Sequence, residues 1–355
     1  MKKILFINPG PFGSLTDTYY YYLHLKDKYN ITYLGCKEDY EIRAFEDINL
    51  IHLDVKSNFF MKKIAFYKRI ILLINSSDYE FILVNYFLGC SIINGFSKKK
   101  VIIDIRTSVI HPNRYNRLLF NSILSFEAKF FDSITIISKG LKGYLKLPEK
   151  SHVLPLGAPK TPLITKSFDK LKLLYVGTFH ERNIIITIYG FSKFVDYLND
   201  ENVSHYTIIG NGSDMEISNI KNAIISAGME KHISFIGVVR HPKLLTYLEN
   251  HNVGMSYIPI KEHFQNQPPT KTFEYLLSGM AVIATGTLEN KRIITNNNGV
   301  VIDDSIEDVY QGLVQIYNNR LQYNSEEIQK EAEKYSWETI VKENLIPFIE
   351  RLNSY

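Results

Sequence analysis

Short apolar runs separated by longer helical patterns recur along the whole chain, and this alternation limits what it can fold into. The first series of runs is Ile4–Asn8, Ile31–Leu34, Leu50–Leu53, Phe81–Val84, Val101–Ile105, Ile134–Ile137 and Val153–Leu156. The second series is Leu171–Val176, Tyr206–Ile209, Ile233–Ile236, Val253–Tyr257, Ala281–Ala284 and Val300–Ile302. Strands that alternate with helices pair in parallel and are covered by helices on both faces. The sequence therefore predicts an α/β protein with two doubly wound sheets.

Residues that interrupt regular structure fall between the two series and mark a linker. They are Pro155, Gly157, Pro159 and Pro162. Proline and glycine are the strongest local punctuators of secondary structure. We expect a first domain over residues 1–160, a second over 165–336, and a last helix over about 337–355. A chain of 355 residues gives each domain enough length to bury a core.

The composition is that of a globular protein. Hydrophobic residues make up 45% and charged residues 22%. No apolar run reaches the ~18 residues needed to cross a bilayer. The first run ends at Asn8 and is too short for a signal peptide, so we interpret it as a strand. Cys36 and Cys90 fit neither a metal-ligand spacing nor a disulfide framework, which predicts a reduced, cytoplasmic protein.

Charge is distributed unevenly along the chain. Residues 1–165 contain 23 Lys and Arg against 14 Asp and Glu, a net charge of +9, whereas residues 166–355 contain 18 against 23, a net charge of −5. A basic half suggests a nucleic acid or an anionic membrane as partner. No nucleic-acid module is recognisable, so we expect no nucleic acid and favour a membrane surface.

A helical pattern from Phe59 to Ile74 carries part of this charge. Its predicted core-facing stripe, at spacings of four and three, is Phe60, Ile64, Tyr67, Ile71 and Ile74. The basic residues around the rest of the helix are Lys62, Lys63, Lys68 and Arg69. Phe66 falls among these charges, and an exposed aromatic flanked by bases is typical of an interfacial helix. A solvated amphipathic surface helix is the alternative.

The stretch from Gln267 to Thr285 reads as loop, helix, turn and buried strand. Pro268 and Pro269 end the segment before it, and Thr270 is the predicted N-cap of a helix through Ser278. A left-handed glycine, Gly279, is expected to end that helix.

This predicted helix presents two kinds of group to one place. Its start offers the backbone N–H groups of Lys271 and Thr272 to a phosphate. Glu274 offers a carboxylate that can accept two hydroxyl protons, as from a ribose diol. A capped helix followed by a solvated glutamate is the alternative interpretation.

The residues Pro-Thr-Lys-Thr-Phe-Glu-Tyr-Leu-Leu-Ser-Gly-Met-Ala-Val-Ile-Ala from Pro269 to Ala284 resemble the nucleotide-sugar signature of retaining glycosyltransferases of family 4. The resemblance implies the GT-B fold, in which two Rossmann-like domains face a cleft and the final helix crosses back to the first domain. It implies that Glu274 holds the donor ribose. The position of a second family glutamate, eight residues earlier, is Asn266, which can still hydrogen-bond a sugar hydroxyl.

A second part of the resemblance is the segment from Tyr175 to Arg182. In the family this loop holds the donor diphosphate. Gly177 would allow a close turn, and Thr178 stands where the family usually has an arginine. Arg182 matches a later basic position and becomes the expected diphosphate partner, since a guanidinium binds phosphate oxygens in a bidentate way. A surface arginine at a helix start is the alternative.

Two further segments of the second domain match the family pattern. Gly210 lies in a glycine turn after a strand, within Ile209-Gly-Asn-Gly-Ser213. The segment from Ile236 to Arg240 resembles the part that brackets the donor base.

In the first domain the candidate residues follow strands. Gly13 lies in the turn after the first strand, either a weak phosphate loop or an ordinary turn. Asp104 and Arg106 face the same side of a buried strand's end, as acceptor-side catalytic groups or as a structural ion pair. His111 is a candidate group near the transferred sugar, and a histidine that only satisfies local backbone is the alternative.

The resemblance implies transfer of a sugar from a nucleotide-sugar substrate to an acceptor hydroxyl with retention, without a separate cofactor or a bound metal. The sequence has no Asp-x-Asp and no His/carboxylate cluster, so Arg182, Lys271 and helix N-termini would stabilise the leaving diphosphate. The expected acceptor is a sugar or a lipid-linked sugar in bacterial cell-surface polysaccharide or glycolipid assembly, at the inner face of the membrane. A nucleotide-sugar epimerase and a non-catalytic nucleotide-sugar-binding protein are the alternatives.

Overall fold

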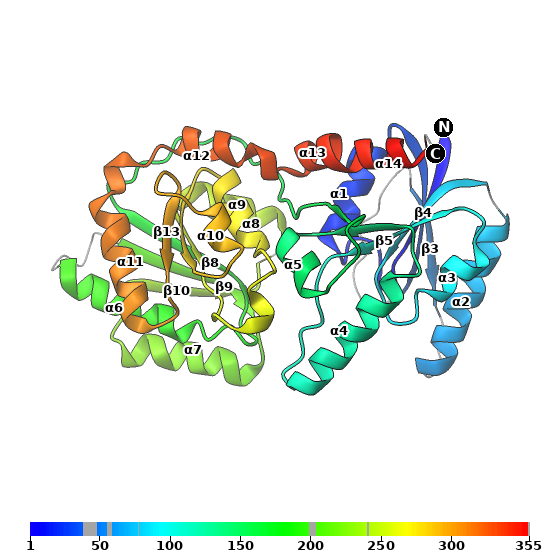
Figure 1. Cartoon of the computed structure of the whole chain (residues 1–355). Helices are drawn as coiled ribbons and strands as arrows, with labels where there is room; N and C mark the ends of the chain where they lie inside the picture. The colour runs from blue at the N-terminus through cyan, green and yellow to red at the C-terminus, as the bar shows by residue number, and fades with distance from the viewer. Residues whose placement is uncertain (38–47, 55–58, 77, 199–203, 240, 354–355) are drawn as a thin grey trace. The chain divides into compact units, whose positions relative to one another are not determined.

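The computed structural model describes residues 1–37, 48–54, 59–76, 78–198, 204–239 and 241–353. The chain divides into two compact units. Unit 1 is Met1–Leu156 together with Ile340–Tyr355, and unit 2 is Gly157–Thr339 (Figure 1). From the sequence we expected the first domain to end at residue 160 and the second to span residues 165–336.

Unit 1 is built on a seven-stranded sheet in the order β3-β2-β1-β4-β5-β6-β7. Its strands are β1 (Lys2–Ile7), β2 (Tyr29–Cys36), β3 (Asn49–Leu53), β4 (Tyr79–Asn85), β5 (Lys100–Ile105), β6 (Ser133–Ile136) and β7 (His152–Val153). Every described pair of neighbours is parallel. The central strands are buried on both faces, which explains why they read as continuous apolar runs.

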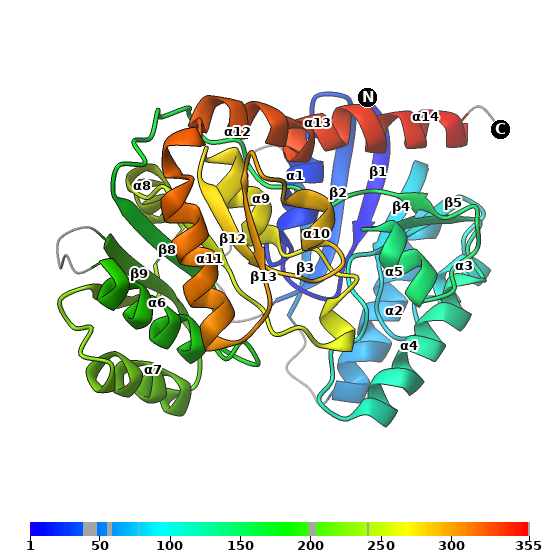
Figure 2. The ribbon, with the colours of Figure 1, turned by 60° about the vertical axis from the view of Figure 1, so that its left-hand side comes forward.

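Helices cover both faces of this sheet. They are α1 (Thr16–Leu25), α2 (Phe59–Ser76), α3 (Ile92–Phe96), α4 (Arg114–Ala128) and α5 (Lys139–Tyr144). The connections that contain α2, α3, α4 and α5 all cross the sheet in the same direction. Because such crossovers are right-handed, these helices share one face, and α1, whose connection runs the opposite way, lies on the other (Figure 2).

The predicted orientation of α2 is wrong. Phe66 is only 4% exposed and packs against Phe87 at a ring distance of 5.7 Å, whereas Phe60 is 69% exposed. The buried stripe is Phe66, Ile70, Leu73 and Ile74. This helix is apolar on two adjacent stripes, and both satisfy a spacing of three and four, so the periodicity alone did not distinguish them. No helix in the described ranges is long and apolar enough to cross a bilayer.

Two features of unit 1 follow from prolines. The strand β7 ends at Val153, earlier than expected, because Pro155 has no N–H to continue the ladder. The last segment consists of α13 (Trp337–Ile340), a π-helical stretch (Val341–Leu345) and α14 (Ile346–Asn353). Pro347 lacks the donor of a regular helical bond, which accounts for the irregular turn before it. Within unit 1, Phe348 of α14 stacks on His152 at 4.6 Å.

Unit 2 has a six-stranded parallel sheet in the order β10-β9-β8-β11-β12-β13. Its strands are β8 (Leu171–Thr178), β9 (Ser204–Asn211), β10 (Ile233–Gly237), β11 (Val253–Ser256), β12 (Ala281–Thr285) and β13 (Gly299–Ile302). Its helices are α6 (Ile185–Leu198), α7 (Asp214–Ser226), α8 (His241–Asn250), α9 (Thr270–Leu277), α10 (Asn290–Ile293), α11 (Ile306–Asn318) and α12 (Ser325–Ala332), with short 3-10 turns at Glu262–Phe264, Arg320–Gln322 and Glu333–Tyr335. The prediction of two doubly wound parallel sheets is therefore confirmed.

Strand ends in unit 2 approach closely at a pair of glycines. Gly177 of β8 is the register partner of Gly210 of β9. A Cβ atom on Gly210 would lie 2.0 Å from the carbonyl oxygen of Gly177. Gly210 is thus required by backbone packing at the carboxyl edge of the sheet.

We expect Gly210→Ala to destabilise the protein by about 1–3 kcal/mol, because the new methyl group meets a backbone atom that cannot move aside cheaply. Gly143, in helix α5, is the matched control, since a Cβ atom there would meet nothing within 4 Å. Gly143→Ala should be neutral or stabilise by up to ~1 kcal/mol, because alanine favours helix. Chemical denaturation of both variants measures the difference, and equal stability would show that the strand ends can separate.

Candidate functional site

The start of helix α9 differs by one residue from the prediction, which made Thr270 its N-cap. Thr270 is its first residue, the N-cap position is Pro269, and no side chain caps the helix. The predicted N-cap role of Thr270 is therefore wrong, because the extended backbone of the two prolines carries directly into the helix. Thr272 N donates to Pro269 O at 3.1 Å, so its N–H is not available to a phosphate as predicted. Gly279 has a φ of +68° and ends the helix as expected.

A buried hydroxyl and amide network fixes the start of α9 to the strand ends. Thr272 Oγ1 lies 2.7 Å from the Oγ of Ser256, the last residue of β11, and 3.1 Å from Asn290 Oδ1. Asn290 Nδ2 donates to Thr285 O at the end of β12. One turn on, the hydroxyl of buried Tyr275 accepts from Val176 N in β8 at 2.8 Å. Buried polar groups that are fully satisfied rigidify the structure around them.

The two charged residues of α9 lie on its accessible side and pair with each other. Lys271 Nζ donates to Glu274 Oε2 at 2.6 Å, with side-chain exposures of 28% and 18%. The carboxylate predicted to accept a diol is thus held by the cation predicted to meet a phosphate. Both predicted roles require the pair to open when a ligand arrives.

Apolar side chains of α8 lie beside Glu274. A narrow crevice of about 10 Å³ is lined by Pro159, Thr161, Leu244, Leu245, Leu248 and Glu274. A space of this size holds no more than a water molecule. The Glu274 carboxylate therefore has an apolar wall on one side, which limits its access to solvent. Arg240, at the end of the segment expected to bracket a donor base, lies outside the described residues.

Arg182 is held by an aromatic ring in the loop that leads to α9. Its guanidinium carbon lies 4.6 Å from the ring centroid of Phe264, an arrangement in which the cation is attracted to the ring face. Its neighbours Glu181 and Asn183 both have positive φ, at +55° and +49°. Backbone strain of this kind persists where surrounding structure enforces it, and often accompanies a functional site.

The loop after β8 makes a second contact with the 3-10 turn that precedes α9. Glu181 Oε2 lies 3.7 Å from His263 Nε2, and the two side chains are mostly buried. Together with the Arg182–Phe264 contact, this pair ties the loop after β8 to the 3-10 turn that precedes α9. Asn266, two residues beyond that turn, is half-buried. The structure thus joins the Arg182 loop to the segment of Asn266, Lys271 and Glu274.

The glycines and Thr178 of this region serve local geometry. Thr178 ends β8, and its carbonyl accepts from the hydroxyl of Tyr175 at 2.9 Å. Burial raises the pKa of Tyr175, so this hydroxyl stays protonated as a donor. A Cβ atom on Gly177 would lie 2.9 Å from the same hydroxyl. Sequence reasoning identified the loop but not Tyr175 as its support.

In unit 1, Asp104 and Arg106 belong to a buried network. Arg106 Nε donates to Asp17 Oδ2 at 2.6 Å, and its Nη1 lies 3.5 Å from Asp104 Oδ1. Arg106 also donates to the carbonyls of Leu154 and Pro155, at 2.9 and 3.3 Å. Asp104 is fully buried, and burial raises its pKa. This geometry favours the structural ion pair over a group that meets a substrate.

Sequence reasoning missed three members of this network. Asn85 donates to Asp104 Oδ2 at 3.2 Å and accepts from Asn8 at 3.4 Å. Asp17 pairs with Arg106 from α1. Asn8 and Asn85 both end apolar runs, and polar residues at the carboxyl ends of parallel strands were the available signal.

The other two candidates of unit 1 lie in loops. His111 Nδ1 accepts from Asn113 N at 3.0 Å, the local backbone role that was the alternative interpretation. Gly13 has a φ of +84° in the turn after β1. In that turn Phe12 N donates to His52 Nε2 at 3.1 Å, and burial lowers the pKa of His52, which keeps this nitrogen an acceptor.

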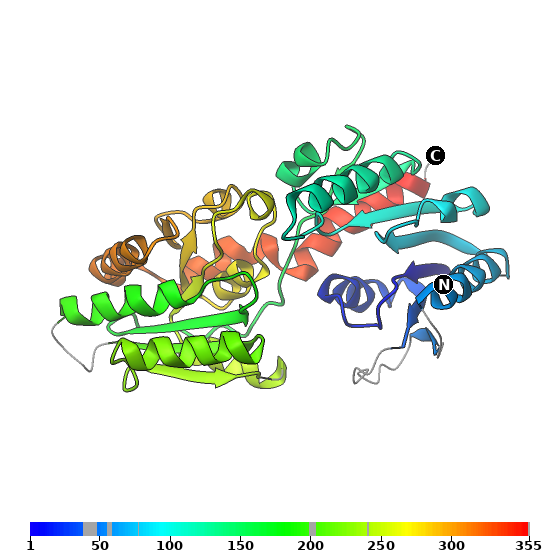
Figure 3. The same ribbon diagram turned by 90° about the horizontal axis from the view of Figure 1, so that it is seen from below.

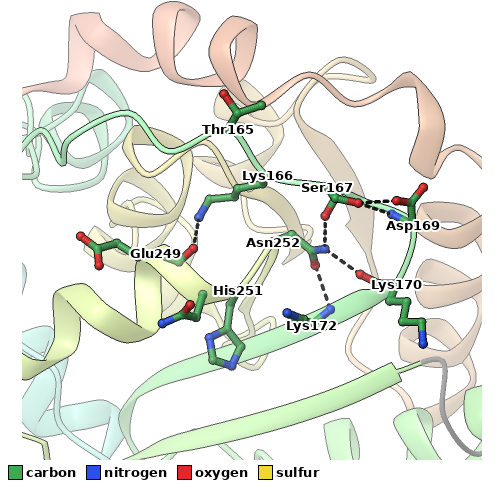
Figure 4. A pocket seen from close by; sticks show the side chains of 10 residues that line it. Thr165, Lys166, Ser167, Asp169, Lys170, Lys172, Glu249, His251 and Asn252 are labelled. Atoms are coloured by element: carbon green, nitrogen blue, oxygen red, sulfur yellow. Dashed lines mark hydrogen bonds between the residues drawn. The ribbon is translucent and has the colours of Figure 1, made fainter.

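A cavity in unit 2 lies at the opposite edge of the sheet, at the amino ends of β8 and β11. It measures about 390 Å³ (Figure 4). Lys166 donates there to the carbonyls of Leu248 and Glu249 at the end of α8, and burial lowers its pKa to about 8. Asn252 bonds the backbone of Ser167, Lys170 and Lys172. These polar groups hold the start of β8, so we place the candidate site at the α9 edge instead.

Comparison with known protein families finds a match within unit 2. Residues 170–319 match the family model described as glycosyl transferases group 1. Unit 2 is therefore similar to group 1 glycosyltransferases over most of its length, and the resemblance to glycosyltransferases stated from the sequence is confirmed. No curated protein sequence matches the chain significantly.

Solved structures confirm the GT-B fold. A sucrose-phosphate synthase from Thermosynechococcus elongatus has a TM-score of 0.78 at 12% identity, with 100% of both chains covered. The lipopolysaccharide outer core galactosyltransferase WaaB has a TM-score of 0.75 at 14% identity, with 99% of both chains covered. Anabaena HepE in complex with UDP and glucose has a TM-score of 0.70 at 12% identity, with 100% of both chains covered. The expectation that the chain is a glycosyltransferase is confirmed at the level of this family.

Glu274→Gln should weaken nucleotide-sugar binding by about 1–3 kcal/mol, since hydrogen bonds to a charged group contribute on that scale. Glu333 is the matched control, because it pairs with Lys160 at the same 2.6 Å in the same unit. Glu333→Gln should leave donor affinity unchanged. Isothermal titration calorimetry of both variants measures the effect, and wild-type affinity in Glu274→Gln would exclude the ribose role.

Proposed function

We propose that this glycosyltransferase moves a sugar from a nucleotide-sugar donor to an acceptor hydroxyl with retention of configuration, in the assembly of a cell-surface polysaccharide or glycolipid. The observation that carries the proposal is the arrangement at the start of α9. There an ion pair of Lys271 and Glu274 follows a loop that is tied, through Phe264, to Arg182. The donor acts as a substrate, and no separate cofactor is required.

Each group has a distinct part in this proposal. Glu274 releases Lys271 and accepts hydrogen bonds from the ribose hydroxyls. Lys271, the N-terminus of α9 and Arg182 then bind the diphosphate and stabilise the charge that develops on it as the bond to the sugar breaks. Asn266 hydrogen-bonds a sugar hydroxyl as a neutral amide. Thr270, Thr178 and the close glycines Gly177 and Gly210 let the backbone approach the donor.

The residues of unit 1 have indirect parts. Asp104 and Arg106 position the strand end and the carbonyls of Leu154 and Pro155, which begin the connection to unit 2. Gly13 shapes the turn after β1, and His111 fixes the backbone before α4. We assign the binding of the acceptor, a sugar or a lipid-linked sugar, to unit 1.

Two of the similar structures support the choice of substrate class. One was solved with UDP and glucose, and another is a lipopolysaccharide galactosyltransferase. A uridine diphosphate sugar and a glycolipid acceptor are therefore the first to test. With a glycolipid acceptor, the enzyme would work in the cytoplasm, on the inner face of an anionic membrane.

A panel of UDP-, GDP-, ADP- and dTDP-sugars tests the function. A ligand that binds only the native state raises the melting temperature, so the donor is identified by thermal shift. Incubation of that donor with candidate acceptors, followed by NMR of the new linkage, should show a retained anomeric configuration. An epimerised donor without acceptor would establish the epimerase, and tight binding with neither transfer nor hydrolysis would establish a binding protein.

We expect transfer to survive EDTA and to fall sharply in Arg182→Ala, because cationic side chains neutralise the diphosphate. Arg320 is the matched control, since its guanidinium carbon also lies over a ring, 4.0 Å from the centroid of Tyr317. Arg320→Ala should keep wild-type turnover. Loss of turnover on chelation and recovery with Mg²⁺ or Mn²⁺ would refute the metal-free mechanism.

A further inference from the structure

The outer side of helices α3 and α4 in unit 1 is apolar where a surface helix is ordinarily polar. We define the α3–α4 face as the side chains that are between 45% (Leu118) and 60% (Phe126) exposed: Ile92, Phe96, Leu118, Leu119, Phe126 and Phe130. Along α4 these residues recur at spacings that keep them on one side of the helix. The opposite side of α4 packs into unit 1 through the apolar Leu124 and Ala128 and the polar Arg117, Asn121 and Glu127.

Contacts join the two helices into one continuous surface. The rings of Phe126 and Phe130 meet edge to face at 5.2 Å. Asn94 Nδ2 of α3 donates to Phe130 O at 2.7 Å. Contiguous exposed apolar patches of this kind mark an interaction surface on an otherwise polar molecule. In the view of Figure 3, α4 lies at the periphery of unit 1.

Most of the charge on these helices is positive. Helices α2, α3 and α4 contain six Lys and Arg, of which Arg117 is buried, and a single carboxylate, Glu127. Glu127 is buried and accepts hydrogen bonds from Gly89 N, Ser91 Oγ and Tyr86 OH, so its charge is used inside unit 1. At the helix ends, exposed Asp78 and Asp132 pair with Lys99 and Lys150.

Helix α2, on the same side of the sheet, adds bases and a second apolar point. Its first turns expose Phe60 and Met61 beside Lys62, with 69% and 50% of the two apolar residues accessible. Further along, Lys68 is exposed. The basic groups therefore flank the apolar residues.

We propose that the α3–α4 face is a membrane-docking surface, with Leu118, Leu119 and Phe126 entering the interface of an anionic bilayer while the bases of α2 bind lipid headgroups. This inference rests on the proposed function only for its choice of a lipid-linked acceptor. Apolar residues flanked by Lys and Arg match the layered chemistry of a bilayer surface. A symmetric contact between two copies would set the same basic helices against each other, which disfavours a dimer.

Vesicle sedimentation at several salt concentrations tests the proposal. Wild-type protein should bind phosphatidylglycerol-containing vesicles, not neutral phosphatidylcholine vesicles, and binding should weaken with salt. The triple variant Leu118→Gln, Leu119→Gln, Phe126→Gln should lose roughly tenfold or more in affinity at low salt. A second variant, Lys62→Gln, Lys68→Gln, Arg69→Gln, should lose the salt dependence and most of the binding.

The control variant is Met215→Gln, Ile225→Gln, Leu321→Gln, which removes similarly exposed apolar side chains from unit 2. It should bind vesicles like wild type. Wild-type binding by the Leu118/Leu119/Phe126 variant, or binding to no vesicle at low salt, would overturn the proposal. A concentration-dependent dimer by light scattering, lost in that variant, would overturn it in favour of an interface between copies.

Donor thermal shift on each variant separates this proposal from the proposed function. Vesicle binding without any rise in melting temperature with nucleotide sugars would support the membrane-docking surface and refute the proposed transferase function. A normal rise in melting temperature with donor, in a protein that binds no vesicles, would refute only the proposed membrane-docking surface. Circular dichroism melting of each variant verifies that it is folded.

Discussion

The candidate site depends on one buried contact, the hydroxyl of Thr272 between Ser256 and Asn290. It joins the first turn of α9 to the ends of β11 and β12, and the Tyr275–Val176 bond joins the second turn to β8. Hydrogen bonds in a dry interior are directional and costly to leave unmade. The orientation of α9 is therefore set by the sheet, and Lys271 and Glu274 inherit their positions from it.

Unit 1 also depends on a buried polar network, but the groups in that network are charged, whereas those around Thr272 are neutral. The guanidinium of Arg106 compensates Asp17 and contacts Asp104, and it also binds two carbonyls after β7. A buried carboxylate left without its partner costs several kcal/mol. The network therefore fixes where the chain leaves unit 1.

The sequence predicted the sheets, the turn at Gly279 and the segments around Arg182 and α9, since each depends on local periodicity or on a short motif. It did not predict the orientation of α2, because Phe60 and Phe66 lie on adjacent apolar stripes and tertiary packing chose between them. The Thr272 and Asp17 networks were also missed. Their partners lie 16 to 89 residues away along the chain, so no local spacing records them.

The pair of Lys271 and Glu274 has a consequence for discrimination between ligands. Inorganic phosphate that captured Lys271 would leave a mostly buried carboxylate without its cation, beside the leucines of α8. A free sugar that captured Glu274 would leave the ammonium unmatched in the same way. In the proposed donor site, only a molecule that carries an anion and a diol at the right separation would satisfy both side chains. If the proposed roles hold, the specificity of this pair would arise from the energetic penalty on ligands that match only one of its two members.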